Sequence, residues 1–275
     1  MSGPSADRWP RPSVVGILNV TPDSFSDGGS YASADDATRA ARRMLADGAA
    51  LVDVGGESTR PGADDVSQDE ELRRVVPVLE ALSGLPVSID TSRSEVARRA
   101  VALGATMVND VSALRREPAL AEVVAGSGVD VCLMHMLGTP RTMQVEPRYD
   151  DVVDDVAAFL EERLAFAVGA GIAEDRVCLD PGIGFGKTPD HNLELLRRLD
   201  RIVALGRPVL VGVSRKSTLA RVLGDDGAVG SDAASVGAAV AAFDRGATLF
   251  RVHDVAAHVE ALAAAAAVER GSLVA

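Results

Sequence analysis

Three residues of this sequence, Asp90, Asn109 and Asp180, could together bind a flat, nitrogen-rich ring. Each comes at the end of a short apolar run, so its side chain would stand where a buried strand meets a loop. A carboxylate can take two parallel N–H donors from a 2-amino-4-oxo ring edge, and an amide can both donate and accept. These residue types indicate a site that exchanges hydrogen bonds with an amide-like heterocycle.

A second group, made of Arg60, Arg251 and His253, indicates a site for an anionic group such as phosphate. The chain has 28 Lys and Arg residues against 40 Asp and Glu residues, which gives a net charge of −12 at pH 7. A molecule with this charge does not attract anions over long distances, so an anionic substrate requires a local group of positive side chains. The same charge argues against a nucleic-acid or acidic-membrane partner.

The segment Ser214-Arg215-Lys216-Ser217 follows an apolar run and precedes a helical stretch. The backbone N–H groups and the dipole at a helix start favour a carboxylate or a phosphate. Lys216 and Lys187 are the only lysines in the chain, and both lie in Gly- or Ser-rich loops after predicted strands. Because an ammonium and a guanidinium are not interchangeable, lysine at these two places hints at a specific use.

Eight short, nearly continuous apolar runs are expected to be the strands that position these residues. Such runs are typical of parallel strands that are covered on both faces. They are Val14–Leu18, Leu51–Val54, Val87–Ile89, Met107–Asn109, Asp130–Met134, Val177–Leu179, Val209–Val213 and Thr248–Val252.

The segments between the strands carry helix signals. Ser67 begins a capping-box pattern, and glycines such as Gly48 and Gly246 stand where a helix should stop before the next strand. The last helix is expected from Val255 to Glu269. Eight such units predict an α/β fold, a single-domain (β/α)8 TIM barrel over residues 13–275, preceded by a flexible segment over residues 1–12. In such barrels the chemistry lies at the carboxyl ends of the strands.

The remaining signals indicate an ordinary cytoplasmic protein. No apolar run is long enough for a membrane span, and the first residues have no apolar core of a signal peptide. Cys132 and Cys178 lie in apolar runs and are expected to be buried, reduced thiols. The four histidines show no zinc spacing; His258 is expected on a helix surface and His191 at a helix start.

Several segments, taken in order, resemble the dihydropteroate synthase family across nearly the whole chain. The matching segments are Gly16–Gly29, Asp53–Ala63, Ser88–Thr91, Asn109–Val111, Leu133–Met136, Asp180–Lys187, Ser214–Ser217 and Arg251–Val255. The resemblance implies a pterin-binding TIM barrel that joins 6-hydroxymethyl-7,8-dihydropterin pyrophosphate to p-aminobenzoate in folate synthesis, with release of pyrophosphate. It also implies Mg²⁺ as cofactor and a homodimer.

The resemblance assigns roles to individual residues. The pterin would be bound by Asp90, Asn109, Asp180 and Lys216, with Met134, Phe185 and Gly212 as walls. Asn19 would hold Mg²⁺ on the pyrophosphate, which Thr59, Arg60, Arg251 and His253 would also bind. The p-aminobenzoate would contact Phe25, Thr59, Pro61, Phe185, Lys216 and Ser217. Asp27, Arg60, Lys216, Arg251 and His253 would be catalytic, with Asp27 near the carbon that becomes cationic as the diphosphate leaves.

Two alternatives and several roles stay open at this point. A barrel that transfers a methyl group from methyltetrahydrofolate to a corrinoid protein would share the pterin residues, but it has no use for Arg60, Arg251, His253 or Ser217. An inactive paralogue that acts as a binding module should have lost some of Asn19, Asp27, Arg60 or Lys216, and all four are present. The sequence assigns no role to Asp23, Glu57, Asp110 or Lys187.

Overall fold

A computed structural model describes residues 9–20, 34–60, 62–226 and 229–272 of the chain. Three residues with predicted roles, Phe25, Asp27 and Pro61, lie outside these described residues. The predictions made for them therefore stay predictions.

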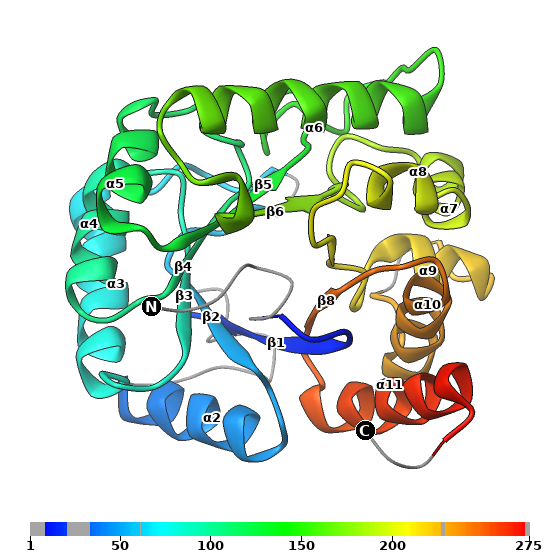
Figure 1. Ribbon diagram of the computed structural model, residues 1–275, viewed down its shortest axis with the longest axis horizontal. Helices are drawn as coiled ribbons and strands as arrows, with labels where there is room; N and C mark the ends of the chain where they lie inside the picture. Colours follow the sequence, from blue (N-terminus) through cyan, green and yellow to red (C-terminus); the bar gives the residue numbers. More distant parts are fainter. Residues whose placement is uncertain (1–8, 21–33, 61, 227–228, 273–275) are drawn as a thin grey trace.

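Eight parallel strands form a barrel, as the sequence predicts (Figure 1). Hydrogen-bonded neighbours follow the order β6-β5-β4-β3-β2-β1-β8-β7, and a parallel bridge between Leu179 and Val209 joins the two ends of this row. The strands are β1 (Ser13–Asn19), β2 (Leu51–Gly55), β3 (Val87–Asp90), β4 (Met107–Asp110), β5 (Asp130–Met134), β6 (Val177–Asp180), β7 (Leu210–Val211) and β8 (Leu249–Val252). β7 is shorter than predicted because the carbonyl of Val209 accepts hydrogen bonds from both Thr248 and Leu249, which breaks the regular ladder.

Helices surround the barrel on its outside (Figure 1). They are α2 (Ala34–Ala46), α3 (Gln68–Ala81), α4 (Ser94–Ala102), α5 (Ala119–Ser127), α6 (Val152–Gly169), the 3-10 turn η2 (Glu174–Arg176), α7 (Pro189–Arg197), α8 (Asp200–Val203), α9 (Ser217–Val222), α10 (Asp232–Asp244) and α11 (Val255–Arg270). The N-cap half of the predicted capping box is confirmed, since the Ser67 hydroxyl accepts a hydrogen bond from the Glu70 N–H at 3.2 Å. The Glu70 carboxylate pairs with Arg73 and Arg74 instead of completing the box. Gly48 and Gly246 have φ of 100° and 99°, a conformation that suits glycine at a helix stop.

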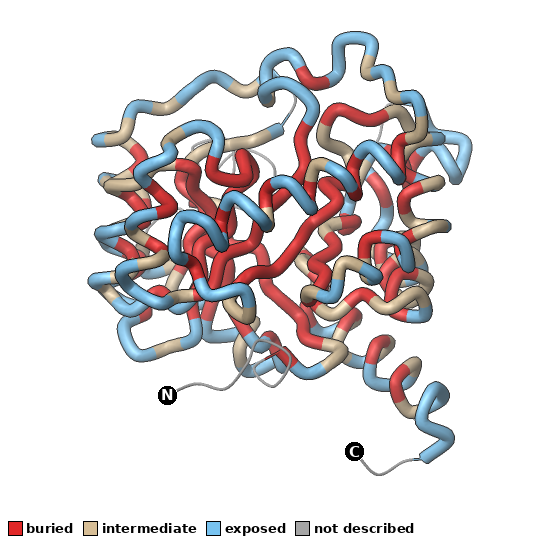
Figure 2. Tube along the Cα trace, turned by 45° about the horizontal axis from the view of Figure 1, so that its top comes forward, coloured by how far each residue is buried: buried red, intermediate tan, exposed pale blue. Residues whose placement is uncertain are grey.

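The two larger of three apolar clusters stabilise the barrel. The larger one lies between the strands and the helices. In Figure 2 the buried residues accordingly lie in the centre of the molecule and the exposed residues at its periphery. The smaller core joins residues from the amino-terminal part of the strands: Trp9, Val15, Leu51, Met107, Cys132, Cys178, Leu210 and Leu249. Both cysteines are buried and free, as predicted. The smaller core leaves the carboxyl ends of the strands for polar side chains.

Two local predictions differ from the structure. Within the predicted flexible segment 1–12, Trp9 is only 8% exposed, and Arg11 donates to the carbonyl of Ala247 at 3.1 Å and pairs with Glu269 at 2.8 Å. The barrel therefore includes at least residues 9–12. His258 was expected on the surface but is fully buried, because it shares the inward face of α11 with Val255, Leu262 and Ala266.

In the described residues, none of the helices combines the length and the apolar character needed to cross a membrane.

Candidate active site

The carboxyl ends of the strands bring together the residues that the sequence predicts to bind a flat ring. Asp90 closes β3 and lies opposite Asn109 of β4 in the strand register. Asp180 closes β6, and its carboxylate accepts a hydrogen bond from the Gly182 N–H at 2.7 Å. Arg251 pairs with Asp90 at 2.8 Å, and the charges of Lys216 and Arg251 oppose the rise in the pKa of Asp180. Asp90, Asp180, Lys216 and Arg251 form the polar ring of the site.

Arg251 lies at the centre of this ring. Its Nε donates to Asp53 at 2.7 Å and its Nη2 donates to Asp90 at 2.8 Å, while only 19% of the side chain is exposed. Burial alone would lower the pKa of Arg251, but the two carboxylates outweigh it and raise the pKa. In this structure the guanidinium is therefore neutralised by carboxylates, and its Nη1 group has no protein partner among the described residues.

The carboxylates of the ring are hard to ionise. Burial raises the pKa of Asp90 to about 7, although the charge of Arg251 opposes this. Burial also raises the pKa of Asp180 to about 6, opposed by the Gly182 N–H and by Lys216. Desolvation disfavours the charged form of a carboxyl group, and a buried carboxylate gains most from a ligand that offers N–H donors. Both residues are thus suited to bind a donor-rich ring edge.

Lys216 lies beside these carboxylates. It precedes the first turn of α9, and its Nζ lies 4.1 Å from the centre of the Phe185 ring. Burial, followed by the charge of Arg251, lowers the pKa of Lys216 to about 8, while Asp180 opposes this shift. An ammonium over an aromatic face is a cation–π arrangement, and it fixes the lysine and the phenyl ring relative to one another.

Apolar side chains adjoin the polar ring on one side. Met134 packs with Val111, Met136 and Met143, and the half-buried Phe185 packs against this cluster. A Cβ placed on Gly212 would meet no atom within 4 Å, so space is open beside this residue. Met134, Phe185 and Gly212, the three predicted walls, therefore border the same end of the barrel as the carboxylates.

His253 differs from the sequence-based view of a positive cluster. Its Nδ1 lies 3.0 Å from the Ser214 hydroxyl. Burial, assisted by the charges of Arg215, Arg251, Lys216 and Arg60, lowers the pKa of His253 to about 3. The ring is consequently neutral at pH 7 and can offer hydrogen bonds but no positive charge.

The segment Ser214–Ser217 follows β7 and leads into α9, as the sequence predicts. Arg215 adopts a left-handed conformation with φ of 58°, and its side chain pairs with Asp232 at 2.8 Å, away from the polar ring. Ser217 is exposed at the start of α9. Two residues in the segment are thus directed differently, since Lys216 faces the carboxylates and Arg215 faces α10.

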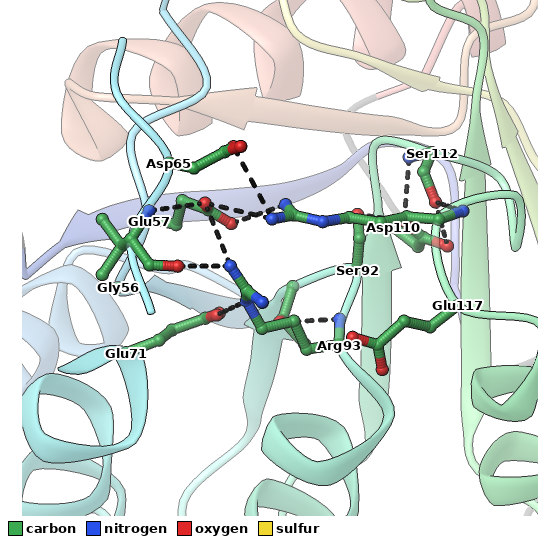
Figure 3. A network of polar contacts seen from close by, with 12 residues as sticks. Gly56, Glu57, Asp65, Glu71, Ser92, Arg93, Asp110, Ser112 and Glu117 are labelled. Atoms are coloured by element: carbon green, nitrogen blue, oxygen red, sulfur yellow. Dashed lines mark hydrogen bonds and ion pairs between the residues drawn. The ribbon is translucent and has the colours of Figure 1, made fainter. Parts of the chain in front are cut away.

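Thr59 and Arg60 lie on the loop after β2, and a network of ion pairs around Glu57 and Arg93 adjoins this loop (Figure 3). Arg93 lies between two carboxylates, 3.0 Å from Glu71 and 3.6 Å from Glu57, and it also donates to the carbonyl of Val66. Glu57 in turn accepts from the Val66 N–H at 3.1 Å. Glu57, whose role the sequence leaves open, therefore anchors the loop that carries Thr59 and Arg60.

Asp110, another residue without a predicted role, also organises a loop. Its two oxygens accept from the hydroxyl of Ser92 at 2.5 Å and from the backbone N–H groups of Ser112 and Leu114 at 2.8 and 2.6 Å. It accepts a further bond from the Ser112 hydroxyl at 3.1 Å. With both oxygens engaged, Asp110 is a structural residue of the loop after β4.

Lys187 stabilises the loop that carries Phe185. Its buried Nζ donates to the carbonyls of Gly182 and Phe185, both at 3.0 Å, and lies 2.8 Å from Nδ1 of His135. Burial lowers the pKa of Lys187 to about 7, and burial together with the charge of Lys187 lowers the pKa of His135 to about 2. The imidazole is therefore neutral and accepts a hydrogen bond from the lysine.

The predicted Mg²⁺ ligand, Asn19, lies at the end of β1 near Asp90. A Cβ placed on Gly55 would lie 3.5 Å from Oδ1 of Asn19 and 3.6 Å from Oδ2 of Asp90. Among the described residues, no group of three or more His, Cys, Asp or Glu side chains could hold a metal ion. Mg²⁺ often takes only one or two protein oxygens and completes its shell with water and phosphate, so a lone amide oxygen fits an ion that arrives with a diphosphate.

Asp53 is a residue of the ring that the sequence analysis did not assign. It lies in the middle of β2, two residues before the strand end, and is 1% exposed. A signal was present, because Asp53 and Arg251 are charged residues in the middle of otherwise apolar strands. Buried charges of opposite sign are expected to pair, and these two do.

Comparisons with known proteins agree with this geometry. A family model described as "Pterin binding enzyme" matches residues 15–253. The dihydropteroate synthase of Neisseria meningitidis serogroup C is 48% identical over 259 residues, which cover 92% of this chain and 92% of that protein.

Two solved structures are similar over nearly their whole length. The Yersinia pestis dihydropteroate synthase in a complex with a sulfonamide drug has a TM-score of 0.88 and 46% identity, covering 94% of this chain and 95% of that one. The Xanthomonas albilineans dihydropteroate synthase with 4-aminobenzoic acid has a TM-score of 0.87 and 48% identity, covering 96% of this chain and 97% of that one.

Proposed function

The chain belongs to the pterin binding enzyme family, and we propose that it is a transferase that catalyses the dihydropteroate synthase reaction. The substrates are 6-hydroxymethyl-7,8-dihydropterin pyrophosphate and p-aminobenzoate, and the products are 7,8-dihydropteroate and pyrophosphate. The observation that carries this proposal is the polar ring at the carboxyl end of the barrel, where Arg251 pairs with Asp90, Asp180 closes β6 and Lys216 precedes α9. The identity of 48% to a dihydropteroate synthase supports it.

The carboxylates and the amide of the ring bind the pterin in this proposal. Asp180 takes N–H donors from the 2-amino-4-oxo edge, and Asp90 and Asn109 complete the hydrogen bonds. Met134 and Phe185 contact the apolar faces of the bicycle, and Gly212 leaves room for it because its Cβ direction is open. Burial supports these roles, since the pKa of Asp180 near 6 leaves it ionised at pH 7 and in need of donors.

The diphosphate lies further from the barrel interior than the pterin ring, where Thr59, Arg60 and His253 can reach it. The Nη1 group of Arg251 is available from below, since only Nε and Nη2 are engaged by carboxylates. Asn19 would hold Mg²⁺, which when bound would supply positive charge to the leaving diphosphate. Asp27, which lies outside the described residues, stays assigned by the resemblance alone, near the carbon that becomes cationic.

The reaction is a substitution at the methylene carbon of the pterin. The bond between that carbon and the diphosphate oxygen breaks, the amine nitrogen of p-aminobenzoate forms the new C–N bond, and the amine loses a proton. Negative charge grows on the diphosphate as the bond breaks, so fixed positive groups such as Arg60 stabilise the transition state more than the substrate.

The p-aminobenzoate occupies the outer part of the site. Phe185 and Lys216 are held together by their cation–π contact, so the ring can lie on Phe185 while its carboxylate approaches Lys216 and the exposed Ser217. Thr59 borders the same region on the loop after β2. The contacts proposed for Phe25 and Pro61 concern residues outside the described part of the chain.

The test of the proposed function is pyrophosphate release by the purified protein. We expect release that requires the pterin pyrophosphate, p-aminobenzoate and Mg²⁺ together. Arg60→Ala should lower kcat by roughly 100-fold, the scale of removing one charge that stabilises the transition state. Arg201→Ala, which removes an exposed arginine of α8, is the matched control and should be unchanged. Absence of release from the unaltered protein would refute the proposal.

Two further properties remain proposals that rest on the family resemblance. We propose that the protein acts as a homodimer in the cytoplasm. Light scattering of the purified protein would give the mass of the assembly, and a monomeric mass would contradict the dimer. Cell fractionation would test the compartment.

A further inference from the structure

Asp53 has no place in the proposed reaction, yet it lies directly beneath the residues that would bind the pterin. In the strand register Asp53 is opposite Ser88, whereas Asp90 is opposite Gly55, two residues further along β2. Asp53 is 1% exposed, and protein donors already engage both of its oxygens, so it is not open to a ligand above Asp90 and Asn109. A buried carboxylate in this position requires another explanation than substrate contact.

Three donors surround the Asp53 carboxylate. Its Oδ1 accepts from the Ser88 hydroxyl at 2.5 Å, and its Oδ2 accepts from Nδ2 of Asn109 at 3.0 Å and from Nε of Arg251 at 2.7 Å. Oδ2 accepts from the Arg251 guanidinium, which can only donate, and the group that Asn109 turns toward this oxygen is its NH₂ group. The carbonyl oxygen of Asn109 must then point the other way.

The orientation of Asn109 determines what the site can recognise. Among the described residues no donor is within hydrogen-bond distance of Oδ1 of Asn109, so this oxygen is left for a ligand N–H. A flipped amide would place its NH₂ group there instead and would favour a ligand acceptor. Asp53 therefore determines whether Asn109 presents an acceptor or a donor to the ligand.

We infer that Asp53 is a positioning residue, which acts through Asn109 and Arg251 to give the ring site its preference for N–H donors. Through Oδ2 it holds the Asn109 amide with its oxygen toward the ligand, and it holds the guanidinium of Arg251 beneath Asp90. The inference deepens the proposed function and rests on it, because the ligand in question is the pterin ring. Asp53 touches no reacting atom in this account.

Two substitutions separate orientation from simple loss of structure. Asp53→Asn keeps an oxygen for Asn109 and Arg251, because its NH₂ group can turn to the Ser88 hydroxyl, which is able to accept. Asp53→Leu removes the acceptor and leaves Asn109 free to flip. Ser88→Ala is the matched control, since it removes a hydrogen bond to Oδ1 without changing Oδ2.

The experiment measures binding of 6-hydroxymethyl-7,8-dihydropterin by calorimetry, with circular dichroism and thermal unfolding to show that each variant is folded. We expect Asp53→Leu to bind roughly 30-fold more weakly, while Asp53→Asn and Ser88→Ala stay within roughly threefold of the unaltered protein. The conservative variant thus rescues the binding that the apolar one loses.

A double-mutant cycle with Asn109→Leu shows whether Asp53 acts through the amide. If it does, adding Asp53→Leu to Asn109→Leu should weaken binding much less than adding it to the unaltered protein. Additive losses, or unchanged binding by a folded Asp53→Leu, would overturn the inference while leaving pterin binding itself intact. Failure of the unaltered protein to bind the ring would instead overturn the proposed function and the inference with it.

Discussion

Asp180 shows at the scale of one residue that this site is held at a cost in stability. Its carboxyl group is buried at the end of β6, and its pKa rises from the ordinary 3.8 to about 6. The folded protein therefore binds this proton more tightly than the unfolded chain does. The contribution of Asp180 to stability is full below pH 4 and is lost as the pH rises through about 6.

Asp180→Asn is accordingly expected to stabilise the protein at neutral pH and to weaken the binding of the pterin. As the pH rises from 4 to 7.5, the free energy of unfolding of the variant should increase relative to that of the unaltered protein by up to about 3 kcal/mol. Each unit of the pKa shift corresponds to about 1.4 kcal/mol. Pterin affinity should fall by about 1.5–3 kcal/mol, the scale of one charge-assisted hydrogen bond. Urea denaturation at both pH values and calorimetry measure the two effects.

The control for this variant is Asp190→Asn, which alters an exposed aspartate in the first turn of α7. It should change neither the pH dependence nor the affinity. A stability difference for Asp180→Asn that stays constant across this pH range would show that the carboxyl group is not desolvated as described.

The residue scale also shows what the sequence could predict. Asp90, Asn109 and Asp180 were found because the ends of parallel strands meet at one edge of the barrel. The pairing of Arg251 with Asp53 and Asp90 was not, because it depends on how deep each side chain lies. The neutral state of His253 was also missed, since it results from burial and from arginines distant in sequence.

At the scale of elements, the loop after β6 owes its shape to Lys187. Removing the ammonium in Lys187→Met takes the donor from the Phe185 carbonyl and from Nδ1 of His135, whereas the Gly182 carbonyl keeps the Phe185 N–H at 3.1 Å. We expect a loss of about 2–4 kcal/mol in the free energy of unfolding, because unsatisfied buried acceptors are costly. The displaced Phe185 should raise the KM for p-aminobenzoate by roughly tenfold, about 1.4 kcal/mol.

Urea denaturation and steady-state kinetics test this prediction, with calorimetric binding of the pterin ring as a third measurement. Because Asp180 precedes the loop and is held by β6, ring affinity should change less than the KM for p-aminobenzoate. A folded variant whose KM for p-aminobenzoate is unchanged would show that the lysine does not position Phe185.

The loop after β4 depends in the same way on Asp110. Ala113 and Leu114 have φ of 52° and 63°, which is unfavourable for residues with a side chain, and Asp110 holds this backbone by accepting from the Leu114 N–H at 2.6 Å. Asp110→Ala should destabilise the protein by about 2–4 kcal/mol, because it leaves buried donors unpaired. Thermal unfolding measures the loss. A loss in the free energy of pterin binding that exceeds the loss in the free energy of unfolding would contradict this purely structural role.

The elements themselves were largely predictable, whereas their connections were not. Continuous apolar runs identified all eight strands, and Ser67 marked the start of α3. The support of the loop after β2 could not be seen, since Arg93 comes from the start of α4 and Glu71 from α3. His258 was misplaced although its spacing from Val255 and Leu262 fits the buried face of α11.

At the scale of the whole molecule, the barrel has an apolar end and a charged end. Trp9 packs with Met107, Leu210 and Leu249 in the smaller core, on the side of the amino-terminal strand ends. The proposed site lies at the carboxyl ends of the strands, so the smaller core and the site are at opposite ends of the barrel. If the chain is one cooperative domain, as the sequence predicts, both ends should unfold together.

Trp9 is the only tryptophan in the chain, which makes its fluorescence a specific probe of the apolar end. We expect the urea transitions followed by this fluorescence and by circular dichroism to coincide. Trp9 is 8% exposed, so its emission maximum should shift to longer wavelength only when the smaller core opens. A pterin ligand at 100 times its Kd should raise the free energy of unfolding by about 2.7 kcal/mol. The urea midpoints of both signals should therefore rise by the same amount. Trp9→Phe controls for the assignment of the signal. A fluorescence transition that precedes the loss of circular dichroism would show that residues 9–12 detach from a barrel that stays folded, and a ligand effect on only one signal would separate the two ends into independent units.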